Sequence, residues 1–118
     1  MGTVESFEHA VYSVAARFAY IQRVVTLDKT ANAIKLRLYV TAGCFVQIYA
    51  NVRKKITSYA LVLGETRIYG RNCDGGTWHR HPYEDPESHD FSPEGSREVS
   101  LNEFLIEVQQ ILEREGIL

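Results

Sequence analysis

The alternation of apolar and polar residues between positions 34 and 52 constrains the fold more than any other feature of this sequence. Over residues 34–40 and 44–52 every second side chain is apolar, and most of the intervening side chains are polar, charged or aromatic. This period of two is that of a β-strand, whose successive side chains point to opposite faces of a sheet. Ala42 and Gly43 can form a tight turn between the two segments. We therefore expect two antiparallel strands with one buried face.

The same reasoning extends the sheet in both directions. Residues 20–27, 56–63 and 66–71 are predicted strands, and Gly64 with Glu65 fits a two-residue hairpin turn. The connections are short, so the sheet over residues 20–81 should be antiparallel, with about five or six strands.

Helices are predicted at both ends of the chain. Phe7, Val11, Val14 and Phe18 recur at helical spacing within residues 1–19. Residues 100–116 begin with a capping box, in which Ser100 and Glu103 bond each other's backbone, and carry a broad apolar stripe. Packing both helices on the apolar face of the sheet gives a single α+β domain over residues 1–118.

Composition narrows the class of protein. The chain has 118 residues, of which 45% are hydrophobic and 24% charged, as in a globular domain. No apolar run has the length of a membrane span and no secretory signal is visible, so we expect a cytoplasmic protein without membrane association. Cys44 and Cys73 are expected to be reduced thiols, with a disulfide as the alternative.

The charge of the chain changes sign along the sequence. Residues 1–71 contain ten Lys or Arg and four Asp or Glu, whereas residues 72–118 contain three and eleven. If the helices cover one face of the sheet, cations and aromatic rings should gather on the other face, the composition that binds single-stranded nucleic acid or forms a dimer interface. The residues expected there are Lys35, Arg37, Tyr39, Phe45, Tyr49, Tyr59, Arg67, Tyr69 and Arg71.

The stretch from residue 71 to residue 90 is the candidate chemical site, because it contains three of the four histidines. His79 and His81 lie two residues apart and should point to one side of a strand. With His89 they could bind Zn, Ni, Mn or Fe. The alternative is a purely structural role, in which these residues only stabilise an acidic, proline-containing loop over residues 82–99.

A third interpretation is acid–base chemistry without a metal or other cofactor. RNA cleavage needs one group to take a proton and one to donate it, and histidine can do both near neutral pH. His79 and His81 would act with Arg71 and Tyr59 as the catalytic set. The acidic loop residues should raise the histidine pKa values. The residues predicted to bind substrate are Arg37, Tyr39, Tyr49, Arg67, Tyr69, Asp74, Trp78 and Arg80.

Several of these motifs together resemble the TumE-like toxin family of type II toxin–antitoxin systems. The resemblance covers roughly residues 33–112 and is carried by the segments 59–63, 67–76, 78–82 and 100–108, together with His89. It implies a short α+β, RNA-cleaving toxin neutralised by an antitoxin with a helix-turn-helix. The positions that match the family are Tyr59, Arg71, Asp74, His79, His81 and His89. Residues 70–76 depart from the family pattern by an added Gly-Gly.

Three functions follow, in order of preference. The first is a toxin-like endoribonuclease that uses histidine acid–base chemistry, with RNA and a helix-turn-helix antitoxin as partners. The second is a non-enzymatic domain that forms a homodimer or binds nucleic acid. The third is a metal-dependent hydrolase on His79, His81 and His89.

Overall fold

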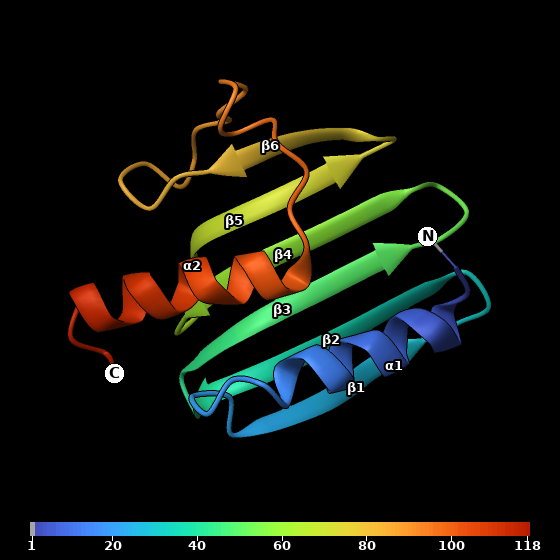
Figure 1. Cartoon of the computed structure of the whole chain (residues 1–118), viewed down its shortest axis with the longest axis horizontal. Helices are drawn as coiled ribbons and strands as arrows, with labels where there is room; N and C mark the ends of the chain where they lie inside the picture. The colour runs from blue at the N-terminus through green and yellow to red at the C-terminus, as the bar shows by residue number, and fades with distance from the viewer. Residues whose placement is uncertain (1) are drawn as a thin grey trace.

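The computed structural model describes residues 2–118, which form a helix, six strands and a second helix. The elements are α1 (Val4–Ala15), β1 (Arg23–Lys29), β2 (Ala33–Thr41), β3 (Cys44–Asn51), β4 (Ile56–Leu63), β5 (Thr66–Asp74), β6 (Thr77–His81) and α2 (Leu101–Arg114). The strands form one antiparallel sheet in the order β1-β2-β3-β4-β5-β6. Both helices lie on one face of this sheet (Figure 1). The predicted α+β architecture is confirmed.

The face of the sheet beneath the helices, called here the covered face, holds the core. The apolar positions of the alternating segments are buried there, namely Ile34, Leu36, Leu38, Val40, Cys44, Val46, Ile48 and Ala50. Burial of a large aliphatic side chain contributes about 1.5–3 kcal/mol. The same alternation turns the residues between them toward the opposite face, called here the open face.

Helix α2 begins and ends as its sequence predicts. The Ser100 hydroxyl accepts from the backbone N–H of Glu103, and the Glu103 carboxylate accepts from the backbone N–H of Ser100. Gly116 follows the helix with φ of 72°, a conformation that glycine adopts without strain. The apolar stripe of α2, including Phe104 and Leu105, is fully buried against the sheet.

Helix α1 ends earlier than predicted, at Ala15. The chain turns at Ala16 and Arg17, and the Phe18 and Tyr20 rings then meet with centroids 5.8 Å apart. Tyr20 is buried, and its hydroxyl donates to the carbonyl of Leu105 at 2.7 Å. This contact with α2 fixes the connection, so β1 starts at Arg23 instead of residue 20.

Strand β5 contains a bulge that the sequence pattern did not predict. Leu61 pairs with Tyr69 but Val62 pairs with Arg67, so Ile68 is an extra residue on β5. Arg67 therefore lies on the open face, whereas Tyr69 lies on the covered face. Tyr59 and Arg71 pair with each other and also lie on the covered face. The prediction that Tyr59, Tyr69 and Arg71 share the open face with Arg67 is wrong.

Residues 82–99 connect the sheet to α2 without a regular element and run along the free edge of β6 (Figure 1). One isolated bridge, between Arg80 and Asp90, attaches this loop to the strand. Within residues 2–118, neither helix combines the length and the apolar character that a membrane crossing needs.

Candidate metal centre

Three histidine side chains converge on the open face at the β6 edge of the sheet. His79 and His81 come from β6, and His89 comes from the loop that follows. The ring centroids lie 4.9 Å apart for His79–His81, 5.0 Å for His79–His89 and 4.8 Å for His81–His89. One nitrogen from each ring lies within 4.8 Å of the other two. The prediction that His79 and His81 point to the same side is confirmed.

Hydrogen bonds orient the buried His81 ring. Its Nδ1 lies 3.0 Å from the carbonyl oxygen of Pro86, which can only accept, so the proton of this bond sits on Nδ1. The Ser58 hydroxyl lies 3.0 Å from Asn72 Oδ1, which leaves Asn72 Nδ2 as the donor facing His81 Nε2 at 3.4 Å. Both contacts therefore fix the tautomer with the proton on Nδ1, in which the Nε2 lone pair of His81 faces Asn72 and would be available to a metal ion only in place of that contact. Nε2 of His81 lies 3.1 Å from Nε2 of His79.

Backbone pairing brings His89 to the other two histidines. Arg80 and Asp90 exchange backbone hydrogen bonds of 3.1 and 2.8 Å, and the Arg80 guanidinium lies 2.7 Å from the Asp90 carboxylate. Hydrogen bonds from Ser92, and then from Arg80, lower the pKa of Asp90 to about 2, so this pair is ionised at neutral pH. Gly95 lies against the Asp90 carbonyl, where a Cβ atom would collide with it. These contacts hold the loop next to β6.

The surroundings favour the neutral form of the two strand histidines. Burial is the largest cause of the lowered pKa of His79, followed by the charges of His89 and Arg67. Burial also lowers the pKa of His81, and Arg67 acts in the same direction. The expectation that the acidic loop raises these pKa values is wrong, because burial lowers both of them and the carboxylate that opposes burial at His79 is Asp74, at the end of β5. A neutral imidazole carries the lone pair that a metal ion needs.

The spacing of the nitrogens is compatible with a tetrahedral ion. For zinc–nitrogen bonds of about 2.05 Å, two nitrogens 3.1 Å apart subtend an angle of about 98° at the metal. At the tetrahedral angle two such bonds place their nitrogens about 3.3 Å apart, so the exposed His89 side chain must move inward by up to about 1.5 Å to complete the set.

Arg71 and Tyr59, the other two predicted catalytic residues, do not join the histidines. Arg71 is completely buried on the covered face, where it bonds Glu107 at 2.7 and 3.2 Å and also bonds Glu94. Tyr59 packs between Trp78 and the core, and burial raises its pKa to about 12. Arg71 was expected beside Arg67 because the bulge at Ile68 was not foreseen, whereas Tyr59 was assigned to the wrong face of the regular strand β4. The structure gives Arg71 a packing role instead.

The predicted substrate-binding residues are divided between the two faces. The open face carries Arg37, Tyr39, Tyr49 and Arg67. The covered face carries Tyr69, Trp78 and Arg80, and Asp74 is exposed at the end of β5. The first group can act together with the histidines, and the charge of Asp74 acts on His79, whereas the sheet separates Tyr69, Trp78 and Arg80 from them.

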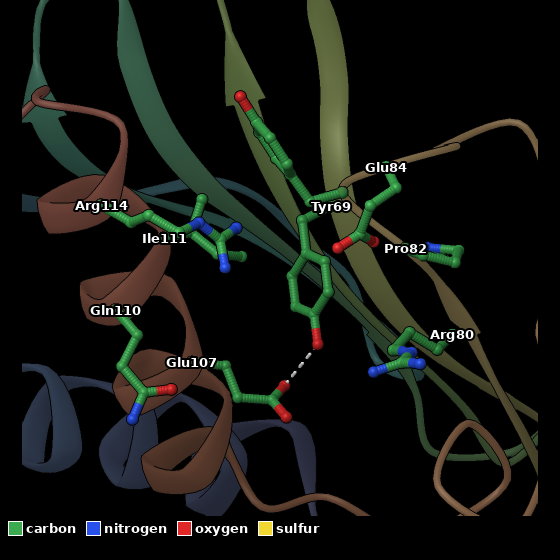
Figure 2. Close-up of a pocket in the computed structure, with 9 residues that line it drawn as sticks. Tyr69, Arg80, Pro82, Glu84, Glu107, Gln110, Ile111 and Arg114 are labelled. Carbon is green, nitrogen blue, oxygen red and sulfur yellow. Dashed lines mark hydrogen bonds between the residues drawn. The ribbon is translucent and has the colours of Figure 1, made fainter.

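A polar pocket on the covered face is a distinct feature. It lies between α2 and the β5–β6 edge, and Figure 2 shows Tyr69, Arg80, Glu107 and Arg114 around it. The Tyr69 hydroxyl donates to Glu107 at 2.9 Å. Arg80 is engaged with Asp90, so the charges that line this pocket are largely matched within the protein.

Sequence reasoning missed three residues that shape the metal centre. Asn72 and Ser58 lie on neighbouring strands and are brought together only by the β4–β5 register. Pro86 acts through its backbone carbonyl, a group that every residue has, so the sequence gives no indication of this role. Asn72 is the cross-strand partner of His79 on the open face, and knowledge of the β5–β6 register would have been needed to predict this from the strand alternation.

Comparisons with protein-family models, with curated proteins and with solved structures find no match for this chain.

Proposed function

We propose that this protein binds a divalent transition-metal ion, Zn²⁺ in the first place, through His79, His81 and His89, and uses it for hydrolysis. The convergence of three imidazole rings, with two Nε2 atoms 3.1 Å apart, is the observation that carries the proposal. Imidazole nitrogen is a common zinc ligand, and three protein ligands leave one tetrahedral position open. An ion held in this way lowers the pKa of a bound water to about 7 and supplies hydroxide at neutral pH.

The neighbours of the histidines support metal binding over simple loop packing. A ligating histidine commonly donates its second ring nitrogen to a carbonyl or carboxylate, which fixes the ring and its tautomer. The contact of His81 Nδ1 with the Pro86 carbonyl has this form. Asn72 faces Nε2 of His81 in the metal-free protein, and a metal ion would replace that contact.

The number and exposure of the ligands favour a catalytic centre over a structural one. Structural zinc sites are closed by four protein ligands. Within residues 2–118 the cluster comprises three histidines, and His89 is exposed to solvent. Water or a substrate can therefore reach the fourth position.

Metal-free RNA cleavage, the function preferred from sequence, is less well supported. It requires an acid and a base on two sides of a phosphate group. His79 and His81 have their Nε2 atoms 3.1 Å apart, with no space for a phosphate between them, and Arg71 lies on the other face. The proposal of a metal-dependent hydrolase has a narrower form. In that form the substrate is RNA, and a helix-turn-helix antitoxin neutralises the protein in the cytoplasm.

The proposal is tested by metal-dependent hydrolysis. Protein stripped with EDTA and reloaded with one equivalent of Zn²⁺ should hydrolyse activated esters or phosphodiesters, whereas the stripped protein should not. His79→Ala and His89→Ala should abolish the gain, and His9→Ala, which alters the exposed histidine of α1, should retain it. Equal activity with and without metal, or retention of activity in His79→Ala, would overturn the proposal.

A further inference from the structure

We infer that Arg67 and the hollow beside it bind a phosphate group, so that the metal centre acts on phosphate diesters. The catalytic part of this inference rests on the proposed function. The binding part stands on the open face alone and can be tested without metal.

Arg67 reaches the histidine cluster across Gly70. The bulge at Ile68 turns the Arg67 side chain to the open face, and its Nη2 lies 3.2 Å from Nδ1 of His81. A Cβ atom on Gly70 would lie 3.4 Å from Arg67 Cδ and 3.1 Å from the carbonyl oxygen of Tyr59. The glycine therefore leaves the space through which the Arg67 stem runs.

The Arg67 guanidinium lacks a matching anion in the protein. Among residues 2–118, no carboxylate lies within ion-pairing distance of it, in contrast with Arg71, Arg80 and Arg97. Its Nε is buried and has no hydrogen-bond acceptor. Since His81 Nδ1 carries a proton, the acceptor available to Nη2 is the Pro86 carbonyl at 3.4 Å. A buried donor without an acceptor is costly, and a guanidinium without a carboxylate partner attracts an anion.

The hollow next to Arg67 has the charge and the donors for one phosphate. It is lined on the open face by Arg37, Gln47, Ser58 and Arg67, with Glu65 at its rim as the acidic residue. The Arg37 guanidinium is held over the Phe45 ring at 4.2 Å and donates to Gln47 at 3.2 Å. Two arginines against one carboxylate leave a net positive charge, which matches a singly charged phosphodiester.

The chemistry of guanidinium selects phosphate esters among anions. Arginine presents paired N–H groups that match two phosphate oxygens, and the pairing is stronger than a neutral hydrogen bond. Arg67 lines the hollow and contacts Nδ1 of His81, so a diester bound in the hollow would extend toward the metal centre. Hydrolysis then forms a P–O bond to the attacking water oxygen and breaks the P–O bond to the leaving oxygen. The leaving oxygen takes a proton, and the products are a phosphate monoester and an alcohol.

The binding experiment uses metal-free protein and two probes. A fluorescently labelled, mixed-sequence single-stranded RNA is followed by anisotropy, and dimethyl phosphate is used as a competitor. Arg67→Gln should weaken RNA binding at least about tenfold and lower the magnitude of the salt slope by about one. Arg17→Gln, which removes the same charge from an exposed position after α1, should bind as the wild type does. Thermal unfolding and circular dichroism establish that both variants are folded.

The hydrolysis experiment uses zinc-loaded protein and bis(p-nitrophenyl) phosphate. Arg67→Gln should lower kcat/KM about 100-fold with unchanged zinc content, and Arg67→Lys should be intermediate because it keeps the charge and loses the paired N–H groups.

The outcomes separate the two proposals. If Arg67→Gln binds both probes as tightly as the wild type does, the phosphate subsite is overturned, whether or not the protein binds zinc. Arg67-dependent binding in a protein that takes up no zinc supports the subsite and overturns metal-dependent hydrolysis. Displacement of the bound RNA by dimethyl phosphate also supports the subsite.

Discussion

Replacement of Arg71 by Met should destabilise the protein strongly while leaving metal binding intact. Arg71 is 0% exposed, and its guanidinium makes two bonds to Glu107 and two to Glu94. Sequence analysis made this residue catalytic, whereas the structure places it under α2. The variant therefore separates a packing role from a chemical one.

The magnitude follows from the partners that Arg71→Met leaves behind. Glu94 is more than half exposed and is solvated by water once Arg71 is gone, so it contributes little to the loss in the free energy of unfolding. Glu107 is only 20% exposed and would retain the Tyr69 hydroxyl and a distant Arg97 at 3.6 Å. Removal of one partner from a buried pair costs about 3–5 kcal/mol. Because Glu107 is partly accessible, we expect a loss of about 3 kcal/mol in the free energy of unfolding.

Urea unfolding followed by circular dichroism measures this loss, with Arg17→Met as the control at an exposed site. The control should change the free energy of unfolding by less than about 0.5 kcal/mol. The double variant Arg71→Met/Glu107→Leu should recover much of the lost stability, since a buried pair can be replaced by apolar groups. A loss below about 1 kcal/mol in Arg71→Met, or a folded variant that no longer binds zinc, would refute the reasoning.

Three further predictions concern the sheet, the helix and the histidines. Gly70→Ala should cost about 1–3 kcal/mol in urea unfolding, because its Cβ would lie 3.1 Å from the Tyr59 carbonyl; an unchanged midpoint would contradict this. Ser100→Ala should cost about 1 kcal/mol through loss of the capping box, and a thermal midpoint equal to that of the wild type would show that the cap is dispensable. The pKa values of His79 and His81 are lower in the folded protein than the unperturbed value of 6.5. As the pH falls through 6.5, these histidines therefore take up protons in the unfolded chain before they do so in the folded protein. The free energy of unfolding of metal-free protein should therefore fall from pH 7 to pH 5, and His79→Asn should flatten the slope; a flat wild-type profile would be the contrary result.

The parts of the fold that sequence predicted are those set by burial. Alternation assigned both faces of β2 and β3 correctly, because every residue there either enters the core or leaves it. The capping box located the start of α2 for an equally local reason. The end of α1 was misplaced because Tyr20 is held by a contact with Leu105, which is distant in sequence.

The candidate site was only partly predictable. The spacing of His79 and His81 sufficed to place both rings on one side of β6. His89 joins them through the Arg80–Asp90 bridge, a loop geometry without a sequence signature. The bulge at Ile68 also has no signature in the sequence. Because of it, the arginine next to the histidines is Arg67 and not the predicted Arg71.

The most direct test of the metal centre is a zinc titration of EDTA-stripped protein against a chromophoric chelator. We expect one Zn²⁺ per chain in the wild type and in His9→Ala, and a loss of affinity of at least about tenfold in each of His79→Ala, His81→Ala and His89→Ala. If the wild type binds no zinc, or if all three ligand variants still bind it, the three histidines are not a metal centre.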